Sequence, residues 1–244
     1  MKGNKTILGS ILIIGLVLVV AGTDTYTGAF FVDVETSMDN TLSAGELDLK
    51  IRDQSEGYGD GVTGTWTASE MKPGDEWEFD VPFAGLFNGG TVDGNHLEIT
   101  CDYAVIEESP QTESDTQPDT NLHPEKMAKE MIITKSIYRG STDDGKFCIN
   151  ALNGKKYTSF NPVYRYCFGT ILGESSDWKI EDIDGDGKIT FYDLKMDKLD
   201  NLPAPDEETT YIMDVKFSET AGNDFQGDTF NLTMIFTLNQ DASQ

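Results

Sequence analysis

The chain has 244 residues, and its 43 acidic and 18 basic side chains give a formal net charge of −25. So large a negative charge opposes binding to nucleic acid or to anionic lipid, and it favours solubility and cation binding. An acidic surface suited to a salty or calcium-rich medium explains the charge without a specific cationic partner. The length suits a single β domain behind a leader.

Residues 1–29 have the pattern of an export signal. Lys2 and Lys5 precede an apolar run from Ile7 to Val20, which is shorter than the roughly 20 residues that a membrane span needs. Small residues at 27–29 predict cleavage between Ala29 and Phe30. An uncut membrane anchor is the alternative. Cleavage would release a secreted chain that meets the membrane only during export.

A strand pattern begins where the leader ends. Apolar and polar side chains alternate through Phe30, Phe31, Val32, Asp33, Val34, Glu35 and Thr36. After cleavage this strand is a free N-terminus with unpaired backbone groups. It either folds into its own sheet or enters the sheet of a neighbouring copy.

Further strands are predicted at 47–51, 77–83, 97–103, 211–217 and 230–238, with turns rich in glycine between them. Many short strands of this kind predict an all-β fold, an antiparallel β-sandwich over residues 30–244. Cys101 is in phase with Leu97, Ile99 and Tyr103, which indicates a buried thiol. In 211–217 one face is apolar, and the other face, residues 212, 214 and 216, is mostly polar.

The region from about 104 to 205 differs and is predicted as an insertion of loops and a short helix, not an independent domain. Residues 107–120 are rich in Ser, Thr, Asp, Glu, Gln and Pro, which predicts a mobile loop, and 124–132 reads as a helix. Cys148 and Cys167 flank an Asn-Gly turn here. Export permits a disulfide between them, which would stabilise the fold by about 3 kcal/mol.

The sharpest chemical motif is an acidic loop at 182–193 that matches an EF-hand. Carboxylates fall at loop positions 1, 3, 5 and 12, which are Asp182, Asp184, Asp186 and Asp193. Gly187 stands where the chain must turn sharply, Lys188 offers its backbone carbonyl, and Thr190 offers its side chain or a water. Calcium takes six to eight oxygen ligands, so calcium is the predicted cofactor.

Asp at the last position, with a helix predicted over 191–199, resembles the calcium loops of dockerins. Only one such loop occurs, which favours a structural calcium over a paired sensor. An acidic turn that holds no metal is the alternative.

No catalytic residues are predicted. His96 and His123 are the only histidines, and neither lies in a His-Glu-x-x-His pattern, so both are expected at the surface. No Gly-x-Ser-x-Gly, phosphate loop or dinucleotide fingerprint occurs. Asn231 opens an Asn-Leu-Thr tripeptide, a candidate for glycosylation.

Four stretches, at 28–36, 41–49, 71–75 and 223–232, resemble the TasA/camelysin family of secreted biofilm-matrix fibre proteins and the related archaeal bundling pili. They cover both ends of the mature chain but not the region from 104 to 205. The resemblance implies a jelly-roll-like sandwich, a specialised signal peptidase, and fibres in which Phe30 to about Thr36 of one subunit completes the sheet of the next. The calcium loop is outside the family pattern. Some members of the family were described as metalloproteases. This chain has no zinc ligands in a recognisable spacing, so that activity is not expected here.

The leading hypothesis is therefore a structural subunit that polymerises with itself, head to tail, into cell-surface filaments for biofilm or cell–cell adhesion, with other matrix components as further partners. The alternative is a monomeric, calcium-binding surface or matrix accessory protein whose first strand stays in its own sheet. A secreted hydrolase is a third hypothesis, for which no activity is expected.

Overall fold

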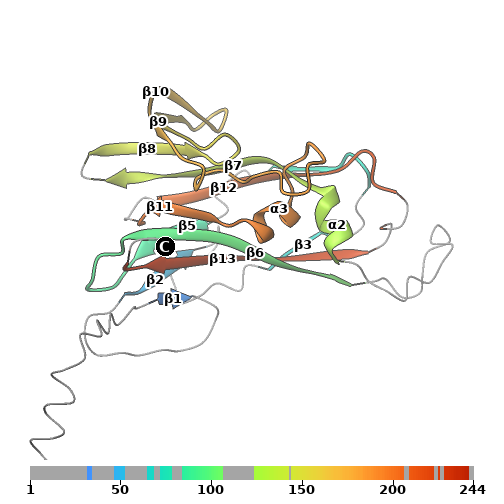
Figure 1. The fold of residues 1–244 in the computed structure, drawn as a ribbon, viewed down its shortest axis with the longest axis horizontal. Coiled ribbons are helices and arrows are strands. Elements are labelled where there is room, and N and C mark those ends of the chain that lie inside the picture. Colours follow the sequence, from blue (N-terminus) through green and yellow to red (C-terminus); the bar gives the residue numbers. More distant parts are fainter. Residues whose placement is uncertain are drawn as a thin grey trace, which may run out of the picture. The chain divides into compact units, whose positions relative to one another are not determined.

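Two antiparallel β-sheets make up the fold of the computed structural model (Figure 1). The structure describes residues 32–34, 47–52, 65–68, 72–78, 84–106, 124–142, 144–205, 209–222, 225 and 228–241. All of these residues belong to one compact unit, Phe31–Gln244. The predicted signal peptide, residues 79–83 of one predicted strand, the 107–120 loop and His123 lie outside the described residues.

The smaller sheet has five strands in the order β1, β13, β6 and β11, and β3 also pairs with β13. These strands are β1 (Val32–Val34), β3 (Thr65–Ala68), β6 (His96–Ile106), β11 (Leu199–Pro203) and β13 (Thr229–Asn239). β6 and β13 are the two long strands of this sheet, and they pair along their whole length (Figure 1).

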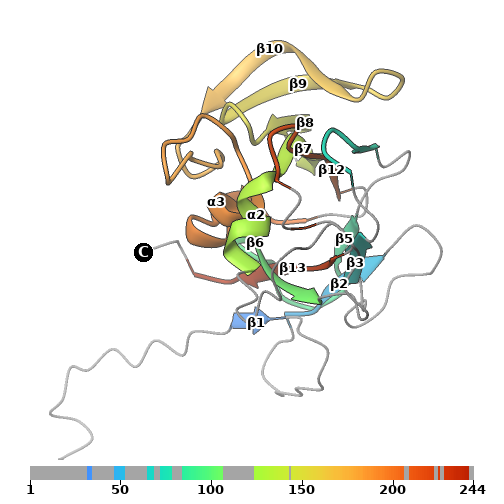
Figure 2. The ribbon, with the colours of Figure 1, turned by 90° about the vertical axis from the view of Figure 1, so that its right-hand side faces the viewer.

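The larger sheet has eight strands in the order β10, β9, β8, β7, β12, β5 and β2, and β4 also pairs with β12. These strands are β2 (Leu49–Arg52), β4 (Glu76–Glu78), β5 (Ala84–Asn88), β7 (Met131–Thr142), β8 (Gly145–Asn150), β9 (Lys155–Asn161), β10 (Tyr166–Glu174) and β12 (Thr209–Phe217). In Figure 2 the β9–β10 hairpin arches over one end of this sheet.

One apolar core joins the two sheets, and the alternation of the sequence identifies its members. Most of the predicted inward positions of β6, β12 and β13 are buried: Leu97, Ile99, Cys101, Tyr103, Tyr211, Met213, Val215, Phe217, Phe230, Leu232, Phe236 and Leu238. Met234, on the same face of β13, is partly buried. The rings of Tyr211 and Phe236, one from each sheet, meet edge to face at 5.9 Å. Burial of each such side chain contributes about 1.5–3 kcal/mol. The all-β prediction is confirmed.

The outer face of β12 is not the mostly polar surface that the sequence predicted. Ile212 packs with Ile137 and Cys148 in a second, small apolar cluster, which Phe160 of β9 partly covers. Asp214 is also buried there. It pairs with Lys135 and, at 2.8 Å, with Arg165. The β9–β10 hairpin supplies the cover, and because its partner residues are far away in the sequence, the local pattern carried no sign of it.

The region from about 104 to 205 holds more strand than predicted. It contributes β7, a central strand of the larger sheet, together with β8, β9, β10 and β11. Two short helices accompany them, α2 (Pro124–Glu130) and α3 (Phe191–Met196), and they lie side by side. The helix predicted over 191–199 ends at Met196 because β11 begins at Leu199. The prediction of a loop-and-helix insertion is corrected accordingly, since β7 cannot be removed without opening the larger sheet.

Candidate functional site

The 182–193 loop is shaped by hydrogen bonds from its own backbone to Asp182. The carboxylate of Asp182 accepts from the amide of Gly185 at 2.8 Å and from that of Gly187 at 2.9 Å. Gly187 has a φ of +83°, a conformation that residues with a Cβ rarely adopt. The sharp turn predicted at this glycine is present, and it wraps the loop around the first carboxylate.

Three of the four predicted carboxylates converge. Oxygens of Asp182, Asp184 and Asp193 all lie within 4.8 Å of one another. Asp186 is not in this group. Its Oδ1 accepts instead from the amide of Lys188 at 2.8 Å. Three convergent carboxylates form an all-oxygen cluster of the kind that hard cations such as calcium prefer.

Asp193 has a structural role that the calcium pattern did not predict. Its side chain is fully buried and accepts three hydrogen bonds, from the amide of Ile183 at 2.9 Å, the amide of Thr190 at 2.8 Å and the hydroxyl of Thr190 at 2.7 Å. With Thr190 as N-cap, these contacts form a capping box that starts α3. Asp193 therefore closes the loop on itself and begins the following helix.

Backbone pairing fixes the loop to the larger sheet. The amide of Ile133 in β7 donates to the carbonyl of Ile189 at 2.7 Å, and Ile132 forms a bridge with Thr190. Ile189 is partly buried and packs against the core. In paired EF-hands the two loops support each other. Here β7 supports the single loop instead.

A lysine lies against the acidic loop. The ammonium of Lys129, at the end of α2, lies 2.9 Å from Oδ2 of Asp184 and 4.2 Å from the ring centre of Tyr192. Its hydrogen bond holds the pKa of the Asp184 carboxyl below the usual range. The lysine neutralises part of the charge that a bound cation would otherwise meet.

Of the predicted exchange strand, the structure describes Val32–Val34, which lie at one edge of the smaller sheet, whereas Phe30, Phe31, Glu35 and Thr36 lie outside the described residues. Val32–Val34 pairs with residues 237–239 of β13 in the same chain, and β3 pairs with 230–233 on that side. Among the described strands, none pairs with residues 234–236 there. The described part of this strand therefore adopts one of the two arrangements that the sequence left open, pairing within its own sheet, and it is only three residues long.

A second edge of the fold carries exposed apolar side chains. β10 is the last strand of the larger sheet, and large side chains of the β9–β10 hairpin face solvent: Val163, Tyr164, Tyr166, Phe168, Ile171 and Leu172. A disulfide joins Cys148 to Cys167 and anchors the hairpin to β8, in the pairing that the sequence indicated.

Cys101 is a buried free thiol, and burial raises its pKa.

The expectation for His96 is wrong. This residue is 4% exposed and lies beside Glu98 and Asp200. His96 and Glu98 alternate on β6, so they share one face, but Asp200 comes from β11. The sequence showed His96 and Glu98 as a His-x-Glu pattern in a predicted strand. Only the pairing of β6 with β11 adds Asp200. Asn231 is half-buried in β13.

Comparison of the chain with protein-family models and with curated proteins gives no match. None of the helices in the described ranges is long and apolar enough to cross a membrane. The residues and their geometry therefore carry the functional argument.

Proposed function

We propose that this chain is a secreted structural subunit, similar to the TasA/camelysin proteins, that polymerises head to tail by donor-strand exchange into extracellular fibres or pili. The sandwich would be jelly-roll-like, and the filament would serve biofilm or cell–cell adhesion. The observation that carries the proposal is the position of β1, three residues long and at the edge of β13. A strand held by so few ladder bonds can be exchanged for the same strand of a neighbour.

The register of β1 accounts for how a neighbour's strand would fit. Val34 pairs with Thr237, so the same antiparallel register would set Glu35 against Phe236 and Thr36 against Ile235. A donor strand over 30–36 would thus also cover residues 235 and 236 of β13, which lie between the stretches that pair with β1 and with β3. Each apolar donor side chain that becomes well buried would contribute about 1.5–3 kcal/mol. Such a contact joins two different surfaces and does not close, so it generates a filament.

The 182–193 loop has a supporting role in this proposal. An EF-hand-like calcium ion held by Asp182, Asp184 and Asp193 would order the junction between β7 and α3 and so stiffen the subunit. The motif predicts three further ligands: the backbone carbonyl of Lys188, the side chain of Thr190 or a water, and the carboxylate of Asp186. The exposed apolar edge of β10 also fits a protein that associates with copies of itself, because such surfaces mark interaction sites.

A cross-linking experiment tests strand exchange directly. Val34→Cys together with Thr237→Cys places thiols on paired residues of β1 and β13. Oxidation of assembled protein should give a ladder of covalent oligomers on non-reducing gels, whereas the two single variants should give none. Cross-linking confined to monomers in assembled protein would overturn the proposal. Deletion of residues 30–37 should leave a folded monomer that forms no fibres in negative-stain microscopy.

The alternative function is a monomeric calcium-binding accessory protein of the cell surface or matrix. The pairing of β1 with β13 of its own chain favours it. Under this alternative the double-cysteine variant yields only an internal cross-link, and the deletion variant loses stability without a change in oligomeric state.

A further inference from the structure

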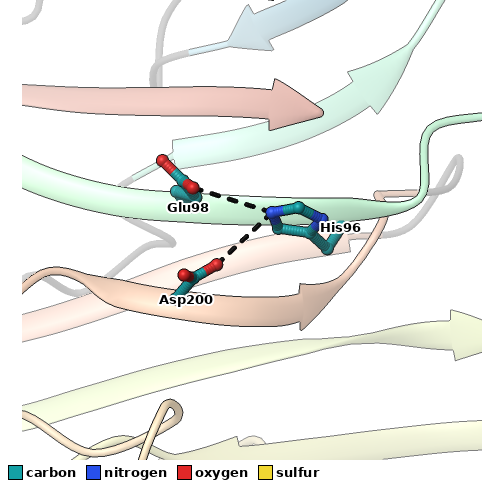
Figure 3. A group of neighbouring side chains, drawn as sticks. All are labelled: His96, Glu98 and Asp200. Carbon is teal, nitrogen blue, oxygen red and sulfur yellow. Dashed lines mark ion pairs between the residues drawn. The ribbon is translucent and has the colours of Figure 1, made fainter. Parts of the chain in front are cut away.

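A second group of potential metal ligands lies on β6 and β11 of the smaller sheet, and it differs from the 182–193 loop in composition. It consists of His96 and Glu98 on β6 and Asp200 on β11, and we call it the His96 cluster. Figure 3 shows the His96 ring with one nitrogen facing both carboxylates. Nε2 lies 3.3 Å from Oδ1 of Asp200 and 3.6 Å from Oε1 of Glu98.

These distances suit shared coordination better than hydrogen bonding. A charge-assisted N–H···O bond is about 2.7–2.9 Å long, which is shorter than both contacts. Ligands about 2.0–2.1 Å from a tetrahedral zinc ion lie about 3.3 Å from one another. Both carboxylates thus stand near the distance from Nε2 that a common metal ion would require, and the three ligand atoms lie within 4.8 Å of one another.

Protein groups do not satisfy both ring nitrogens of His96. Nε2 contacts Nδ2 of Asn239 at 3.2 Å, and Nδ1 is buried with no hydrogen-bond partner. An ion bound at Nε2 would not contact Nδ1, which is a different corner of the ring, so Nδ1 needs a partner of its own such as a water. If Nδ1 carries the proton, Nε2 has one lone pair, and a metal ion bound there would take the place of the hydrogen bond from Asn239.

The charge balance of the cluster favours a cation. Lys198 lies 2.6 Å from Oε1 of Glu98 and 3.9 Å from Oδ2 of Asp200, so one ammonium faces two carboxylates. Its side chain is 46% exposed and can turn into solvent when a metal arrives. The carboxylates are each 19% exposed, which leaves an ion access from solvent.

We propose that the His96 cluster binds one divalent transition-metal ion of the zinc class. Imidazole nitrogen selects such ions, whereas calcium takes oxygen ligands, so the two sites of this chain would differ in the metal they select. Water would complete the coordination of the three side chains. The proposal does not depend on fibre formation.

Isothermal titration of the calcium-saturated protein with zinc chloride tests this. One zinc ion should bind per chain, and Glu98→Gln and Asp200→Asn should each weaken binding by more than about tenfold, the lower end of the effect of losing even an outer partner of a metal site. Asp102→Asn is the matched control: it removes a carboxylate from the same strand, where Asp102 pairs with Lys195 at 2.7 Å, and should leave zinc affinity unchanged.

Cobalt titration adds a readout of geometry. Cobalt in a site of four ligands should give intense visible absorption in the wild type and in Asp102→Asn but not in the two cluster variants. Absence of saturable zinc binding, or equal zinc affinity in wild type and both cluster variants, would overturn the proposal. Two near-isosteric variants keep the test decisive if one of them fails to fold, which circular dichroism reports.

Discussion

The 182–193 loop and the His96 cluster both gather acidic side chains, but different parts of the fold hold them in place. In the loop, Asp182 and Asp193 are fixed by amides no more than ten residues away. In the His96 cluster, Glu98 and Asp200 meet only because β6 and β11 pair in the smaller sheet. A loop that organises itself can keep its geometry when distant parts change, whereas a cluster shared by two strands depends on their register.

The strongest test of a self-organised loop is Asp193→Ala. In the presence of chelator this substitution should lower the free energy of unfolding by about 3 kcal/mol or more, because it removes the cap of α3, leaves the buried donors of Thr190 unsatisfied and removes the acceptor of the Ile183 amide. Urea unfolding measures the loss. Asp186→Ala, an exposed position of the same loop, is the control and should change stability by less than about 1 kcal/mol. Equal effects of the two would mean that Asp193 has no capping role.

Calcium should stabilise the protein through the loop alone. At free calcium a hundredfold above its Kd, the free energy of unfolding should rise by about 2.7 kcal/mol, and chelator should reverse this. Asp182→Ala combined with Asp186→Ala should abolish the response, whereas Glu98→Gln in the His96 cluster should keep it. Thermal melts with and without calcium give the readout. Melting that is indifferent to calcium in the wild type would reduce the loop to an acidic turn.

A smaller effect is expected from the lysine beside the loop. Lys129→Met removes a positive charge that bonds to Asp184, so calcium affinity should rise by about tenfold through lost charge repulsion. Calcium titration calorimetry measures the change. Lys126→Met, an exposed position on the same helix, should have little effect. A decrease in affinity for Lys129→Met would mean that the lysine orders the loop and does not compete with the ion.

Short-range patterns predicted the core well. Alternation placed Leu97, Ile99 and Tyr103 inside, and the same reasoning placed Phe236 and Leu238 inside from the last strand. Each prediction needed only the period of two of a strand with one buried face. The acidic loop was equally visible in the sequence, because its four carboxylates and the glycine at its sharp turn lie within twelve consecutive residues.

Predictions that depended on distant partners failed or stayed open. The outer face of β12 is mixed in sequence, but Ile212 and Asp214 are buried because the β9–β10 hairpin covers them. His96 looked like a surface residue at a strand start, and β11 buries it with an acid about a hundred residues away. Neither partner leaves a periodic signal in the strand that it covers.

By itself the sequence determined an all-β chain, the inward faces of its strands, an acidic loop with calcium spacing and the cysteines suited to a disulfide, because each is encoded within a few neighbouring residues. Tertiary structure alone decided that β7 lies in the middle of the larger sheet, that β1 pairs with β13, and that His96 meets Asp200. Strand order and register join residues that are far apart along the chain, and local preferences contain no term for that pairing.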